Sequence, residues 1–100
     1  MIKILLVCNA GMSTSMLMGK MTAAAKEQNI EAEIWAIPDV RLNEEWPKAD
    51  VILLGPQVAY LKARVETVTQ GTRPVAAIDM LSYGRMNGTA VLAQAIALKG

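Results

Sequence analysis

The single cysteine of the chain lies where an apolar run ends and a segment of small residues begins. Cys8 follows Leu5-Leu6-Val7. A cysteine thiolate is a strong nucleophile, and small residues allow backbone N–H groups to approach an anion closely. A helix that begins in such a segment adds the positive end of its dipole. The pattern predicts a nucleophile, Cys8, in a phosphate-binding segment that comprises Asn9, Ala10, Gly11, Met12, Ser13, Thr14 and Ser15.

A structural reading of the same residues is equally open. Lone cysteines are commonly buried in the core. Three consecutive hydroxyl residues, Ser13, Thr14 and Ser15, also suit the N-cap of a helix. The residue types alone therefore predict either a reactive thiol or an ordinary strand-to-helix turn.

The spacing differs in one respect from that of cysteine phosphatases, which carry a cysteine, five residues, an arginine and then a serine or threonine. Counting from Cys8, Thr14 occupies the arginine position and Ser15 the hydroxyl position. An arginine there clamps the oxygens of the transferring phosphoryl group. Without this clamp, the segment is suited to holding a phosphoryl group rather than to hydrolysing it.

Composition narrows the chemistry further. The chain has no histidine and one cysteine. This excludes a cysteine–histidine catalytic pair, a histidine-ligated metal and a zinc or iron–sulfur site built within the chain. We expect no metal and no cofactor.

The balance of residues is that of one globular domain, which we assign to residues 1–100. Apolar residues make up 53% and charged residues 19%. The net charge of +1 gives no field that favours nucleic acid, although residues 51–100 carry five basic against two acidic side chains. No apolar run has the roughly 18 residues of a membrane helix, and the run at residues 1–7 is too short for a signal peptide. We expect a cytoplasmic protein.

Short apolar runs alternate with amphipathic stretches, which predicts an α/β fold with a parallel sheet. The expected strands are residues 2–7, 30–37, 51–54 and 75–78, the second of them at an edge. The expected helices are residues 13–28, 56–70 and 87–99, with a helix-ending glycine at Gly71 and one helical turn within residues 39–48. Right-handed crossovers then place helices on both faces of a four-stranded sheet in the order 2-1-3-4.

In such sheets ligands bind beyond the carboxyl ends of the strands, between strands 1 and 3. Cys8 heads the first of these loops and residues 55–57 form the second. Pro56 and Gln57 therefore either border the site or merely start a helix. Asp79 and Tyr83 follow the fourth strand on the same rim, where Asp79 suits a helix cap.

Three segments resemble one bacterial protein family. They are CNAGMSTSMLMGKM (residues 8–21), ADVILLGPQVAYL (residues 49–61) and PVAAIDMLSYGRMNG (residues 74–88). Together they resemble the enzyme IIB component of the lactose/cellobiose/chitobiose branch of the sugar phosphotransferase system. The resemblance spans nearly the whole chain, and residues 39–48 match least.

The resemblance implies a phosphoryl carrier. Cys8 would take a phosphoryl group from a phosphohistidine of a IIA protein or domain, with residues 9–15 around it. It would pass the group to a sugar held by the membrane-embedded IIC component, a β-linked disaccharide such as cellobiose, chitobiose or lactose.

Two other classes stay open at this stage. One is a small cysteine phosphatase or arsenate reductase, which the threonine at position 14 disfavours. The other is a non-enzymatic receiver or nucleotide-binding module. No acidic pair follows the first strand, and Gly11 alone is too little for a nucleotide-binding glycine pattern.

Overall fold

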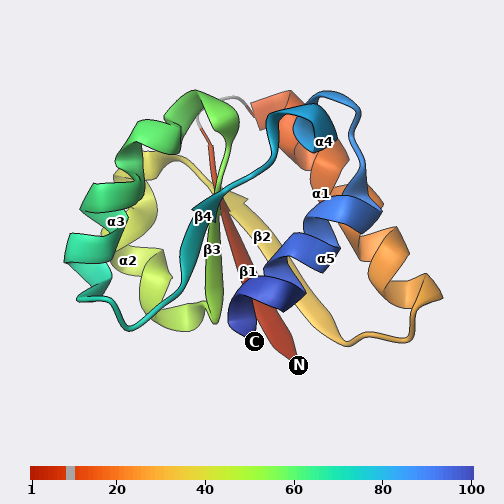
Figure 1. Ribbon diagram of the computed structural model, residues 1–100, viewed down its shortest axis with the longest axis horizontal. Helices are drawn as coiled ribbons and strands as arrows, with labels where there is room; N and C mark the ends of the chain where they lie inside the picture. The colour runs from red at the N-terminus through yellow and green to blue at the C-terminus, as the bar shows by residue number, and fades with distance from the viewer. Residues whose placement is uncertain (9–10) are drawn as a thin grey trace.

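The computed structural model describes the backbone of residues 1–8 and 11–100, and the side chains of residues 1–8 and 14–100. Within these described residues, four strands and eight helical segments follow one another (Figure 1). They are β1 (Ile2–Val7), α1 (Gly11–Glu27), β2 (Ala32–Ile37), η1 (Asp39–Arg41), α2 (Leu42–Glu45), η2 (Trp46–Lys48), β3 (Val51–Leu54), η3 (Pro56–Leu61), α3 (Lys62–Thr69), β4 (Val75–Ala77), α4 (Met80–Gly84) and α5 (Gly88–Lys99). The η segments are 3₁₀-helices.

The sheet confirms the predicted order. All of its strands are parallel, in the order β2-β1-β3-β4, and Leu5 of β1 pairs with Trp35 of β2 and Ile52 of β3. The carboxyl ends of β1 and β3 therefore meet at one edge of the sheet, where Val7 pairs with Leu54.

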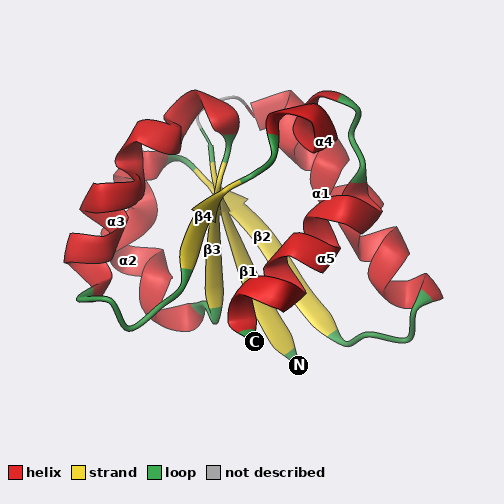
Figure 2. Cartoon of the chain, viewed as in Figure 1, coloured by secondary structure: helices red, strands yellow, loops and turns green. Residues whose placement is uncertain are grey.

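Alternate residues of the central strands feed two separate cores, because successive side chains on a strand point to opposite faces. Ile4 and Leu6 are buried with Leu17 of α1 and Val91 of α5. On the other face Leu5, Val7, Ile52 and Leu54 are buried with Leu42, Val58 and Val65. Figures 1 and 2 show the result: α1 and α5 cover one face, and α2 and α3 cover the other.

The close packing of α1 and α5 depends on a glycine. A Cβ atom at Gly88 would lie 2.3 Å from the carbonyl carbon of Lys20 and 2.5 Å from the amide nitrogen of Met21. Asn87 caps α5, and its side chain accepts a hydrogen bond of 3.1 Å from the N–H of Ala90. The cap and the glycine together fix where α5 begins against α1.

One helix prediction needs correction, and the end of α3 combines the predicted glycine, Gly71, with the residue before it. The helix expected over residues 56–70 is interrupted, because Val58 leaves helical geometry (φ −120°, ψ 22°) and a 3₁₀ segment precedes α3. Pro56 lies in the first turn of that segment, where its missing N–H costs nothing. The left-handed residue that ends α3 is Gln70, with φ 54° and ψ 35°, followed by Gly71 at φ 70°.

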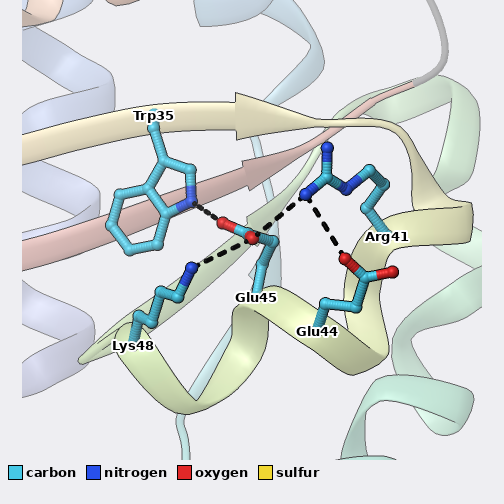
Figure 3. A network of polar contacts seen from close by, with 5 residues as sticks. All are labelled: Trp35, Arg41, Glu44, Glu45 and Lys48. Atoms are coloured by element: carbon cyan, nitrogen blue, oxygen red, sulfur yellow. Dashed lines mark hydrogen bonds and ion pairs between the residues drawn. The ribbon is translucent and has the colours of Figure 1, made fainter.

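The segment between β2 and β3 is also more structured than expected. Its single predicted turn is three short helices, η1, α2 and η2. Figure 3 shows how Glu45 joins it to the edge strand: Trp35 donates 3.0 Å to Glu45 Oε1, and Lys48 lies 3.2 Å from Glu45 Oε2. Arg41 lies 3.5 Å from the same oxygen and 3.3 Å from Oε2 of Glu44. The hydrogen bond from Lys48, followed by that from Trp35, lowers the pKa of Glu45.

Candidate functional site

Cys8 is the first residue beyond β1. Its N–H donates to the carbonyl of Ile37 at 3.0 Å, so the pairing with the end of β2 continues to the cysteine backbone. The residue is 7% exposed and lies three positions before the start of α1 at Gly11. The cysteine therefore precedes a 17-residue helix closely in the sequence, and backbone dipoles at the amino end of a helix favour negative charge.

The loop after β3 approaches the sulfur from one side. Gly55 donates its N–H to the carbonyl of Val7 at 2.9 Å, which draws the two strand ends together. A Cβ atom at Gly55 would lie 3.1 Å from Sγ of Cys8 and 2.9 Å from Oε1 of Gln57. The thiol of Cys8 donates to this Oε1 over 3.7 Å. Gln57 therefore lies beside Cys8 as well as in the first turn of η3, and Gly55 provides the space for the contact.

The segment after β4 approaches the sulfur with a tyrosine. Oη of Tyr83 lies 3.6 Å from Sγ of Cys8 and 3.4 Å from Oγ1 of Thr14. Thr14 is 3% exposed and Tyr83 8%. The sequence predicted Tyr83 on this rim but did not predict its contact with the cysteine. The sequence signal that could have indicated this contact is the position of Tyr83 shortly after the fourth strand.

The helix that carries Tyr83, α4, was not predicted, although its cap was. Asp79 Oδ2 accepts 3.0 Å hydrogen bonds from the N–H and the hydroxyl of Ser82. This confirms Asp79 as a helix cap. Gln94 of α5 donates to the carbonyl of Ala77 at 2.8 Å, which ties the end of β4 to the helix layer.

The predicted phosphate-binding residues have different outcomes. Asn9 and Ala10 lie outside the described residues. Gly11, Met12 and Ser13 form the first turn of α1, and their side chains lie outside the described part of the structure. Thr14 is buried against Tyr83, whereas Ser15 is exposed.

The described part of this segment is therefore helical rather than a loop. A hydroxyl of Ser13, Thr14 or Ser15 cannot be the N-cap, because α1 begins at Gly11. The earlier start leaves backbone N–H groups of the first turn without carbonyl partners inside the helix. Such groups bind phosphate at other helix amino ends. The first turn of α1 has no acidic residue that would oppose an anion.

Among residues 1–8 and 11–100, no three or more His, Cys, Asp or Glu side chains lie together in a group that could hold a metal ion. No helix in the same part of the chain is both long and apolar enough to cross a membrane.

Comparison with known proteins decides the family. The sequence model of the PTS system lactose/cellobiose-specific IIB subunit matches residues 3–94. The chain belongs to this family. Proteins of this IIB family are components of a sugar phosphotransferase system, and this identification confirms the resemblance in the sequence.

Three relatives align with this IIB chain along nearly their whole length. The oligo-β-mannoside-specific EIIB component of Bacillus subtilis is 42% identical over 97 residues, which cover 96% of this chain and 94% of the relative. The cellobiose-specific EIIB component of Lactococcus lactis subsp. lactis is 43% identical over 98 residues, covering 92% and 91%. The galactose-specific EIIB component of Lactococcus lactis subsp. cremoris is 44% identical with the same coverage.

Solved structures share the IIB fold. The cellobiose-specific IIB component from Borrelia burgdorferi has a TM-score of 0.79 at 46% identity, and the match covers 97% of this chain and 90% of that one. The lactose-specific IIB domain from Streptococcus pneumoniae has a TM-score of 0.86 at 14% identity, covering 97% and 96%. The second comparison concerns the fold alone.

Proposed function

We propose that this IIB chain is a phosphoryl carrier whose acceptor atom is Sγ of Cys8. The observation that carries the proposal is the position of this sulfur: beyond β1, three residues before α1, and in contact with Gln57 and Tyr83. A thiolate there meets an incoming phosphoryl group beside the amino end of a helix. The absence of histidine from the chain excludes a phosphohistidine here.

The reaction consists of two transfers. In the first, the Cys8 thiolate attacks the phosphorus of a phosphohistidine on a IIA protein or domain. The S–P bond forms as the P–N bond breaks, and the electron pair stays on the imidazole nitrogen. In the second, a sugar hydroxyl held by the membrane IIC component attacks the same phosphorus. The O–P bond forms, the hydroxyl proton is lost, and the thiolate leaves with the S–P electron pair.

Transfer is favoured over hydrolysis by the residue at position 14. Thr14 stands where cysteine phosphatases carry arginine, and it is 3% exposed and contacts Tyr83. The site thus offers backbone dipoles to the phosphoryl group without a guanidinium clamp on its equatorial oxygens. This supports a carrier rather than a phosphatase or an arsenate reductase.

In this proposal the IIC partner, and not this chain, binds the sugar. We propose a β-linked disaccharide such as cellobiose, chitobiose or lactose, in keeping with the lactose/cellobiose family and with relatives named for oligo-β-mannoside, galactose and cellobiose. We place the chain in the cytoplasm, because the proposed carrier takes phosphoryl groups from IIA and delivers them to the inner side of IIC.

Intact-mass measurement after incubation with phosphorylated IIA tests the acceptor. Wild type should gain one phosphoryl group, and peptide mapping should place it on the peptide that contains Cys8. Cys8→Ser should gain none, because a serine hydroxyl is far less nucleophilic at neutral pH than a thiolate. Full phosphorylation of Cys8→Ser, or phosphate on Ser13, Thr14, Ser15 or Tyr83 in the wild type, would overturn the assignment.

A further inference from the structure

Tyr83 is held in place both by burial of its ring and by hydrogen bonds of its helix. Its ring is part of the buried core between the sheet and the layer of α1 and α5, where it is 8% exposed. Its N–H donates to the carbonyl of Asp79 at 2.9 Å, and the side chain of Asp79 caps the same helix through Ser82. The backbone and the ring are therefore both fixed before the hydroxyl makes any contact.

The hydroxyl of Tyr83 reaches two polar atoms. It lies 3.6 Å from Sγ of Cys8 and 3.4 Å from Oγ1 of Thr14. A buried tyrosine hydroxyl generally needs a hydrogen-bond partner, and sulfur accepts over longer distances than oxygen because it is larger. Either hydroxyl can donate in the contact between Thr14 and Tyr83; when Thr14 donates to Oη, the Tyr83 proton is left to donate to the sulfur.

Gln57 of η3 and Tyr83 of α4 both contact Sγ, and they favour different protonation states of the sulfur. Oε1 of Gln57 is an acceptor, so at 3.7 Å it suits the neutral thiol, which donates to it. The Tyr83 hydroxyl has a proton to give, and a donated hydrogen bond stabilises the charged form of its acceptor. Gln57 is exposed and can turn away when the thiol ionises, whereas buried Tyr83 stays in place.

We infer that Tyr83 is a positioning residue for the nucleophile: its hydroxyl donates to the Cys8 thiolate, holds the sulfur in the direction of attack and favours the ionised form. This inference deepens the proposed function, because a carrier needs the thiolate at neutral pH. It assigns to α4, a helix of five residues, the task of presenting one hydroxyl group to the sulfur.

The test is the pH dependence of Cys8 alkylation by iodoacetamide in the full chain. Tyr83→Phe keeps the ring and removes only the hydroxyl, and it should move the alkylation midpoint upward by about 0.5 to 1 pH unit. Thr14→Val should move it in the same direction by less, and Thr14→Ser should restore the wild-type value. Tyr60→Phe is the matched control, since Tyr60 is 72% exposed on η3.

A merely structural role would lower the unfolding temperature of Tyr83→Phe and leave the alkylation midpoint unchanged, and that result overturns the inference. If Tyr83→Phe does not fold, wild-type NMR decides instead. The Tyr83 ring resonances should shift with the same midpoint as the Cβ resonance of Cys8, and ring resonances that show no such midpoint overturn the inference.

Alkylation requires no partner protein, so the two proposals fail separately. A wild-type chain that accepts no phosphoryl group from IIA rejects the carrier assignment. An unshifted Tyr83→Phe profile in a chain that does accept one rejects only the role of Tyr83.

Discussion

Gly55 lies so close to Cys8 that a side chain at position 55 would press against the sulfur. A Cβ atom at position 55 would lie 3.1 Å from Sγ of Cys8. The backbone of Gly55 has φ −58° and ψ 150°, which any residue adopts. Glycine is therefore needed at this position for space, not for conformation.

We expect Gly55→Ala to fold and to accept phosphoryl groups about tenfold more slowly than wild type, because a displaced nucleophile loses its alignment for attack. The new methyl group would meet the movable end of Gln57 and the rotatable sulfur, so the unfolding temperature should change little. Transfer from phosphorylated IIA, quenched at successive times, measures the rate. Gly19→Ala, where nothing lies within 4 Å, is the control, and a wild-type rate in Gly55→Ala would refute the expectation.

Gly88→Ala should act on stability instead. Its Cβ would lie 2.3 Å from backbone of α1, so the two helices must separate. Overpacking of this kind costs about 1–3 kcal/mol, and backbone atoms cannot turn aside, so we expect the upper part of that range. Urea unfolding measures the loss. Gly84→Ala, with nothing within 4 Å, should remain close to wild type, and equal stability of the two variants would contradict the packing argument.

Thr14→Arg tests whether the site lacks only the arginine of phosphatases. Because Thr14 is 3% exposed and contacts Tyr83, an arginine there must be buried or must push the start of α1 outward. We expect a loss of about 2 kcal/mol or more in the free energy of unfolding and no turnover of an aryl phosphate. Ser15→Arg, at an exposed position of the same helix, is the control. A stable Thr14→Arg variant with phosphatase turnover would show that the clamp was the only missing part.

Glu45 should give the stability a measurable dependence on pH. Its pKa is lowered from its ordinary 4.5, first by the hydrogen bond from Lys48. A carboxyl whose folded pKa is depressed stabilises the fold fully above its unfolded pKa, and this contribution is lost as the pH falls through the folded value. Wild type should therefore exceed Glu45→Gln in stability at neutral pH, and the difference should shrink below about pH 4.5. Urea unfolding across pH measures this.

A carboxylate elsewhere provides the comparison for Glu45. Glu27→Gln on the exposed side of α1 removes the same charge without touching the cluster of Figure 3. A difference between wild type and Glu45→Gln that stays constant from neutral to acidic pH would mean that the carboxylate adds nothing there beyond its shape.

The sheet was predictable because its signal is local. Runs such as Val51–Leu54 are apolar on both faces, which only a covered strand needs, and the order of the strands followed from the handedness of the crossovers. The break at Val58 and the helix α4 were not predictable in this way. Val58 is fully buried, and the packing under β3 sets its conformation against the helical pattern of its own segment.

The candidate site likewise has a part that local sequence could indicate and a part that it could not. Cys8 and the residues after it could be proposed as a site because the proposed nucleophile and the helix that follows it are neighbours in the sequence. The contacts of Cys8 with Gln57 and Tyr83 span 49 and 75 positions, and no local pattern records which side chain on a rim turns inward. Burial of Tyr83 against the α1–α5 layer makes that choice, and it is a property of the packed molecule.

During synthesis, Cys8 emerges from the ribosome 75 positions ahead of Tyr83. At roughly 5–20 residues per second, the nascent chain carries the cysteine for about 4–15 seconds before the tyrosine exists. Its strand, β1, lies between β2 and β3, so the sulfur has its native neighbours only after both strands have paired with β1 and α4 has packed beside them. The surroundings of the Cys8 sulfur are therefore complete only after Tyr83 has been synthesised.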